Sequence, residues 1–76
     1  MSWINAAREV YARHQYAYVR SDGTKCKEKD EGAMLLDAFT SKMLITVHDN
    51  LGEVNRTKFA QMDLRQAVKI GWKVIK

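Results

Sequence analysis

The sequence predicts an all-α protein: a single small domain over residues 1–76, built from about four helices. Three observations favour this fold class. The chain contains no proline, the residue that breaks helix interiors by removing a backbone donor. Apolar residues recur at spacings of three and four along most of the chain, which is the period of an amphipathic helix. Between these stretches lie Ser, Asp and Gly residues of the kind that begin and end helices.

The first helix is expected over residues 3–18. Ser2 belongs to the residue types that cap a helix N-terminus, and apolar residues follow it at helical spacing as far as Tyr18. His14 falls between apolar sectors of this helix. We therefore interpret it as a core histidine, with a pH-sensitive group as the alternative.

A short β-hairpin at residues 16–27 is the alternative for the end of this segment. Aromatic and β-branched residues flank the turn-forming sequence Ser21-Asp22-Gly23. Such a hairpin would make the fold α+β and would need a helix to cover it.

A second helix is expected over residues 31–51, after a charged connection, with Asp30 as its cap. Its apolar face would consist of Leu35, Leu36, Phe39, Met43, Leu44, Val47 and Leu51. Gly52 breaks this pattern, and a short third helix is expected over residues 53–62. That helix would bury Val54, Phe59, Ala60 and Met62.

The last helix, expected over residues 64–75, sorts its side chains by chemistry most clearly. Asp63 stands at its N-cap position, with Gln66 placed to complete a capping box. At about 100° per residue the basic residues share one sector. This basic strip consists of Arg65, Lys69, Lys73 and Lys76.

The opposite, apolar side of this helix is expected to hold the fold together, with Leu64, Val68 and Ile75 among its members. Gly71 interrupts this side and costs about 1 kcal/mol relative to Ala in a helix. Close packing against another helix would explain it, and a tight contact with a partner chain is the alternative.

The composition is that of a folded, basic chain, with 46% hydrophobic and 29% charged residues and a net charge of +4. The positive charge concentrates at the end of the chain, which favours an anionic partner. The same charge equally suits a soluble protein whose last helix places lysines near the negative end of its dipole. No apolar run approaches the roughly 18 residues that cross a membrane, and the N-terminal residues lack the pattern of a signal peptide. We therefore expect a cytoplasmic protein without a membrane partner. The single cysteine, Cys26, excludes an internal disulfide.

Catalytic and metal-binding motifs are absent from the sequence. Asp37, Ser41 and His48 have the residue types of a hydrolase triad, but seven residues of helix would place Ser41 about 10 Å from His48 along the axis. Cys26, His14 and His48 would come from separate elements and lack the spacing of metal ligands. We therefore expect no enzymatic activity, no metal and no cofactor.

Basic and aromatic residues alternate in the first part of the chain, a pattern that holds single-stranded nucleic acid through phosphate contacts and base stacking. The candidate contacts are Arg13, Tyr16, Arg20, Lys25 and Lys27. Acidic residues in the same stretch dilute the charge, and no recognised nucleic-acid-binding motif is present.

The segments LDAFTSKMLITVHDNL (36–51) and VNRTKFAQM (54–62), followed by the amphipathic C-terminus, resemble small uncharacterised accessory proteins of tailed bacteriophages. The resemblance covers residues 35–76 and carries over no functional residue. It implies a protein that acts in the bacterial host cytoplasm by binding a host protein or a nucleic-acid assembly.

These observations predict a non-enzymatic accessory protein of phage type that binds a host protein, with inhibition of that protein as one outcome. The basic strip would contact an acidic surface of the partner. Two alternatives stay open: a small nucleic-acid-binding protein, and a structural or self-assembling protein that forms homo-oligomers or part of a virion.

Overall fold

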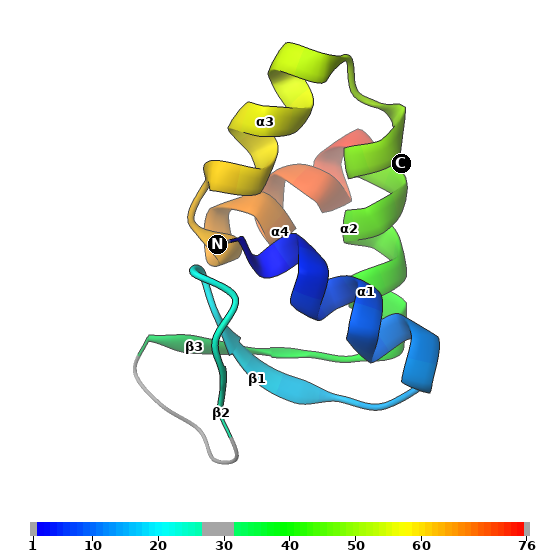
Figure 1. Cartoon of the computed structure of the whole chain (residues 1–76). Coiled ribbons are helices and arrows are strands. Elements are labelled where there is room, and N and C mark those ends of the chain that lie inside the picture. Colours follow the sequence, from blue (N-terminus) through cyan, green and yellow to red (C-terminus); the bar gives the residue numbers. More distant parts are fainter. Residues whose placement is uncertain (1, 27–31, 76) are drawn as a thin grey trace.

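In chain order, a three-stranded antiparallel sheet follows the first helix and precedes the second, so the fold is α+β (Figure 1). The computed structural model describes residues 2–26 and 32–75. Within these ranges the elements are α1 (Trp3–Arg13), β1 (Ala17–Arg20), β2 (Lys25–Cys26), β3 (Ala33–Leu36), α2 (Ala38–Asn50), α3 (Glu53–Gln61) and α4 (Leu64–Val74). The all-α prediction was therefore wrong. The alternative, an α+β fold with a hairpin after the first helix, is confirmed.

The first helix ends at Arg13 and not at Tyr18, because His14 adopts the left-handed conformation with a φ of 53°. The His14 N–H donates to the Tyr11 carbonyl at 3.2 Å and closes the last turn. His14 is exposed, so its prediction as a core residue was wrong. At the other end, Ser2 Oγ accepts a hydrogen bond from the Ile4 N–H, as the cap prediction requires.

The sheet has the order β2-β1-β3, with β1 in the centre. β1 and β2 form the hairpin, in which the Arg20 N–H donates to the Thr24 carbonyl at 2.9 Å and Gly23 supplies a φ of 94°. β3 pairs with the other edge of β1 and places Leu35 opposite Tyr18. This segment was predicted to be helical. A short apolar run suits either structure, and here pairing with β1 makes it a strand.

α2 begins at Ala38 because the Asp37 carboxylate accepts a hydrogen bond from the Thr40 N–H at 2.7 Å. The predicted cap, Asp30, lies outside the described residues. Met43, Leu44 and Val47 are buried as predicted. The side chains of Phe39 and Leu35 are 73% and 46% exposed, so their predicted burial was wrong.

α3 ends within one residue of its predicted bound and contributes a single buried side chain, Phe59. The Phe59 ring meets the Trp3 ring edge to face, with 5.2 Å between centroids. Val54 is 69% exposed, contrary to its predicted burial.

The start of α4 is fixed by a residue from the hairpin turn. The Asp63 side chain makes no capping bond to the helix, so the predicted capping box was wrong. Instead Ser21 Oγ accepts a hydrogen bond from the Leu64 N–H and donates to Asp63 Oδ1, both at 2.9 Å. The hairpin and α4 are thereby joined.

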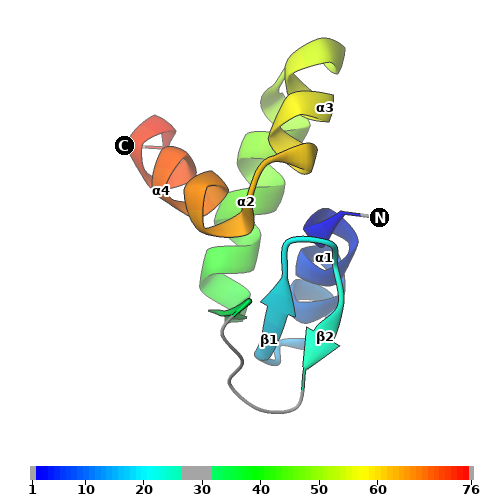
Figure 2. The same ribbon diagram turned by 90° about the vertical axis from the view of Figure 1, so that its left-hand side faces the viewer.

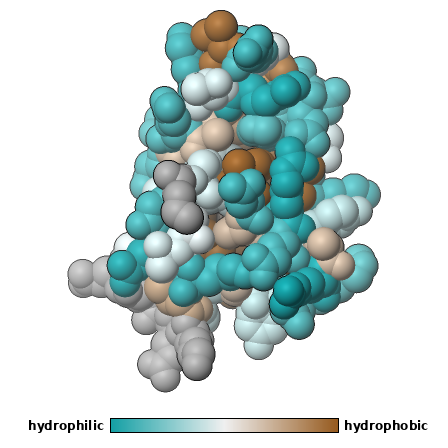
Figure 3. Space-filling view, in the orientation of Figure 1, coloured by the Kyte–Doolittle hydropathy of each residue, from teal (hydrophilic) through white to brown (hydrophobic). Residues whose placement is uncertain are grey.

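The core lies where α1, α2, α4 and the inner face of the sheet meet. α2 runs through the middle, with α1 on one side and α4 on the other (Figure 2). The largest fully buried apolar side chains come from five different elements: Trp3, Val19, Leu36, Leu44 and Leu64. The side of the molecule that carries α1 is mainly hydrophilic, with small apolar patches (Figure 3). Within the described ranges, no helix has the length and apolar character needed to cross a membrane.

Candidate functional site

The basic strip lies on the outer side of α4. Arg65, Lys69 and Lys73 are exposed and line one shallow hollow, whereas Lys76 lies outside the described residues. The opposite side of the helix faces the core through Leu64, Ala67, Val68 and Gly71. The division of α4 into a packing side and a basic side therefore matches the expectation. Two apolar residues near the end of the helix differ, because Val74 and Ile75 are 60% and 43% exposed.

Two of the three cations on α4 are unpaired with carboxylates in the part of the chain that the structure describes. Arg65, Lys69 and Lys73 are the charged side chains of the helix itself. Among the described residues, Lys69 and Lys73 have no carboxylate partner. This side of α4 therefore carries a positive potential that attracts anionic groups.

An apolar groove between α2 and α4 borders the basic strip. The rings of Phe39 and Trp72 stack with 5.7 Å between centroids and 25° between planes. The groove has a volume of about 340 Å³ and is lined by Phe39, Lys42, Met43, Thr46, Trp72 and Ile75. We refer to it as the α2–α4 groove. The sequence interpretation missed it, since Phe39 was assigned to the core.

A second hollow, of about 540 Å³, separates α4 from the outer face of the sheet. Tyr18 and Leu35 line it from β1 and β3, and Arg65 and Val68 line it from α4. Val68 and Trp72 are one helical turn apart, so this hollow and the α2–α4 groove follow one another along the same edge of α4. Apolar surface thus runs beside the cations for two turns.

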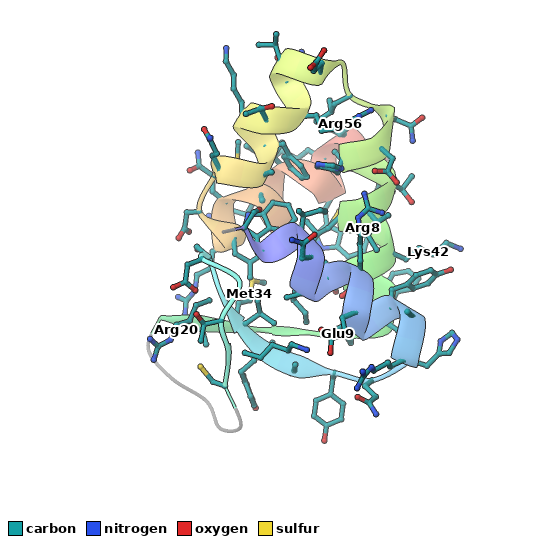
Figure 4. All side chains as sticks on the ribbon, viewed as in Figure 1. Arg8, Glu9, Arg20, Met34, Lys42 and Arg56 are labelled. Atoms are coloured by element: carbon teal, nitrogen blue, oxygen red, sulfur yellow. The ribbon has the colours of Figure 1, made fainter. Side chains whose placement is uncertain are left out.

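Those residues predicted to contact nucleic acid that the structure describes do not form a comparable surface. Arg13 lies 3.8 Å from Glu9, and Lys25 forms an ion pair with the same carboxylate. Glu9 projects from α1 toward the hairpin, and the hydrogen bond from Lys25 lowers the pKa of its carboxyl (Figure 4). Tyr16 is 72% exposed, and Arg20 lies on β1. Lys27 lies outside the described residues, so the structure does not place the fifth member of this set.

Asp37, Ser41 and His48, which have the residue types of a hydrolase triad, each have different surroundings. Asp37 caps α2 through the Thr40 N–H. Ser41 is fully buried, and its Oγ has no hydrogen-bond partner among the described residues. His48 Nδ1 lies 3.0 Å from Asp49 Oδ1. In the described part of the chain, no three His, Cys, Asp or Glu side chains are close enough to hold a metal ion.

A polar network surrounds the end of α2. Arg8 reaches from α1 and donates to both Asp49 carboxylate oxygens, at 2.7 and 3.5 Å (Figure 4). These bonds, with the bond to His48, lower the Asp49 pKa to about 2. Arg56 of α3 donates to the carbonyls of His48, Asp49 and Leu51 at the C-terminal end of α2, where carbonyls lack partners within the helix. The His48 carbonyl also accepts a hydrogen bond from the Leu51 N–H at 3.3 Å.

A hollow of about 470 Å³ next to this network includes Ser2, His48 and Arg56 in its lining. Its donors already serve the fold, because Arg56 bonds to carbonyls and Ser2 Oγ donates to the Ala60 carbonyl at 2.6 Å. This hollow is therefore a weaker candidate for ligand binding than the surface along α4. Cys26 is half-buried at the edge of the sheet and lies outside both regions.

The chain matches no known protein family, no characterised protein and no solved structure.

Proposed function

We propose that this protein is a non-enzymatic accessory protein of phage type that binds an acidic surface of a host protein through the basic side of α4. The observation that carries the proposal is the pairing of charge and apolar surface on one edge of this helix. Lys69 and Lys73 are exposed, have no carboxylate partner within the described residues, and lie beside the stacked Phe39 and Trp72. Protein interfaces combine such aromatic anchors with a charged rim.

The charge distribution favours α4 over the first part of the chain as the contact surface. Glu9 offsets Arg13 and Lys25, so the cations near the hairpin attract an anion less strongly. α4 contains no acidic residue. Binding of nucleic acid stays the alternative, and its salt dependence separates it from binding of a protein.

Affinity capture from a nuclease-treated bacterial lysate tests the proposal. The wild-type chain should retain a protein in stoichiometric amount, and Lys69→Glu with Lys73→Glu should abolish its retention. The matched control is Arg13→Glu with Lys58→Glu, which lowers the formal net charge by the same four units from +4. Arg13 and Lys58 are exposed on other helices.

Two results would contradict the proposal. One is capture that is unaffected by reversal at Lys69 and Lys73. The other is retention of nucleic acid alone when the nuclease is omitted, with an affinity that falls steeply as salt is raised.

A further inference from the structure

The α2–α4 groove is a preformed binding site for an apolar side chain. The Phe39 ring is 73% exposed but is held against Trp72, and Ile75 is 43% exposed beside it. Met43, which is 3% exposed, closes the groove from the core side. An aromatic ring that is already ordered loses little conformational entropy on binding. The groove is therefore suited to receive a bulky apolar group without rearrangement.

One cation lines this groove on α2, and a second lies next to its Trp72 wall on α4. Lys42 lines it on α2 and extends away from the molecule (Figure 4). On α4, Lys69 precedes Trp72 by three residues and is its neighbour on the helix surface. Neither Lys42 nor Lys69 has a carboxylate partner within the described residues. An apolar seat between positive rims complements an apolar side chain flanked by carboxylates.

We infer that the α2–α4 groove binds an acidic amphipathic helix of the partner protein, with one of its bulky apolar side chains seated between Phe39, Trp72 and Ile75. In this mode of recognition the apolar residues of the helix recur at positions i, i+3 or i+4, and i+7. Carboxylates beside them would meet Lys42 and Lys69. The inference rests on the proposed function and adds the chemistry of the bound segment.

Charge and ring geometry disfavour the other occupants. A second copy of the chain would bring the same lysines against one another, and like charges facing each other weaken an interface. A single-stranded nucleic acid needs open aromatic faces for its bases. Here Trp72 covers one face of Phe39, so the ring offers a single open face and not a platform for successive bases.

Selection from a library of displayed peptides of about 15 residues, a length at which isolated helices become marginally stable, tests the inference. The folded full-length chain should enrich acidic peptides with apolar residues at helical spacing. Binding of an enriched synthetic peptide should perturb the NMR signals of Phe39, Lys42, Trp72 and Ile75.

Phe39→Ala should lower the affinity for that peptide by roughly thirtyfold, as expected for loss of a central aromatic anchor. The matched control is Val54→Ala, because Val54 is 69% exposed on α3 and lies outside the groove. This control should change the affinity by less than about twofold. Both variants remove exposed side chains, and urea denaturation establishes that they fold.

The remaining outcomes separate the inference from the proposed function. The selection could instead enrich acidic peptides without spaced apolar residues, which bind Phe39→Ala as well as the wild-type chain but do not bind after charge reversal at Lys69 and Lys73. That result would overturn the inference about the groove and leave the proposed function standing. Failure to enrich any acidic peptide would overturn the inference, whereas the proposed function depends on the capture of a host protein and is decided by that experiment. A dimer that Phe39→Ala dissociates, or an oligonucleotide that perturbs the groove residues, would overturn the inference by assigning another occupant.

Discussion

Gly71 of α4 lies against the Met43 thioether of α2, so near that a Cβ at position 71 would overlap the Met43 sulfur. Both residues are buried. The missing side chain lets the two helices approach, which explains a glycine inside an otherwise favourable helix. The prediction that Gly71 packs closely against another helix is therefore confirmed. The same contact places Met43 at the base of the α2–α4 groove.

Gly71→Ala should lower the free energy of unfolding by about 1 kcal/mol. Overpacking of a core costs about 1–3 kcal/mol and outweighs the gain in helix propensity of about 1 kcal/mol. Urea denaturation measures the change. In a Met43→Ala background the added methyl group has room, so the two substitutions should couple by about 1 kcal/mol or more. An equal effect of Gly71→Ala in both backgrounds would show that the contact with Met43 does not cause the loss of stability.

Ser41→Ala should raise the free energy of unfolding by about 1 kcal/mol. Ser41 Oγ is fully buried without a hydrogen-bond partner in the described part of the chain, and such a group costs about 1–3 kcal/mol. Alanine also has the higher helix propensity. The urea concentration at the midpoint of denaturation should rise, and the dependence of the unfolding free energy on urea concentration should stay the same. A loss of stability would mean that Oγ bonds to a neighbouring group in solution.

His14→Gly should stabilise the protein by about 0.5 kcal/mol. The left-handed conformation costs a residue with a Cβ about 1–2 kcal/mol, and part of this gain is offset by the greater freedom of glycine in the unfolded chain. His14→Val should destabilise, because a β-branched residue fits this conformation poorly. His14 is exposed, so neither substitution disturbs the core. A higher melting temperature for His14→Val than for His14→Gly would contradict this account.

The sequence predicted the last two helices well because their boundaries are local. Gly52 precedes α3, and α4 carries its polar and apolar residues on separate sides. The first helix was predicted too long for a physical reason. Ala17 and Tyr18 suit either a helix or a strand, and the left-handed turn at His14 has no distinctive residue type.

The start of α2 could not be predicted, because it depends on contacts between distant parts of the chain. Residues 33–36 form an apolar run whose structure is decided by pairing with β1, and periodicity within the run carries no information about that pairing. Once β3 forms, Asp37 becomes the cap of α2 and Phe39 falls in its first, exposed turn. The basic strip could be predicted because one helix carries it. The α2–α4 groove could not, because it needs Phe39 and Trp72 from two helices.

The Asp49 carboxyl should titrate near pH 2, below its ordinary value of 3.8, because Arg8 and His48 stabilise the ionised form. A carboxyl whose pKa is lowered on folding contributes stability above its unfolded pKa, and this is lost as pH falls through the folded value. Asp49→Asn should therefore reduce the loss of stability between about pH 4 and pH 2. NMR titration of the Asp49 carboxyl tests the cause directly. Arg8→Met should move the Asp49 pKa toward its ordinary value, whereas Arg13→Met, which removes a cation near Glu9, should leave it unchanged. An Asp49 pKa near 3.8 in the wild-type protein would refute the network.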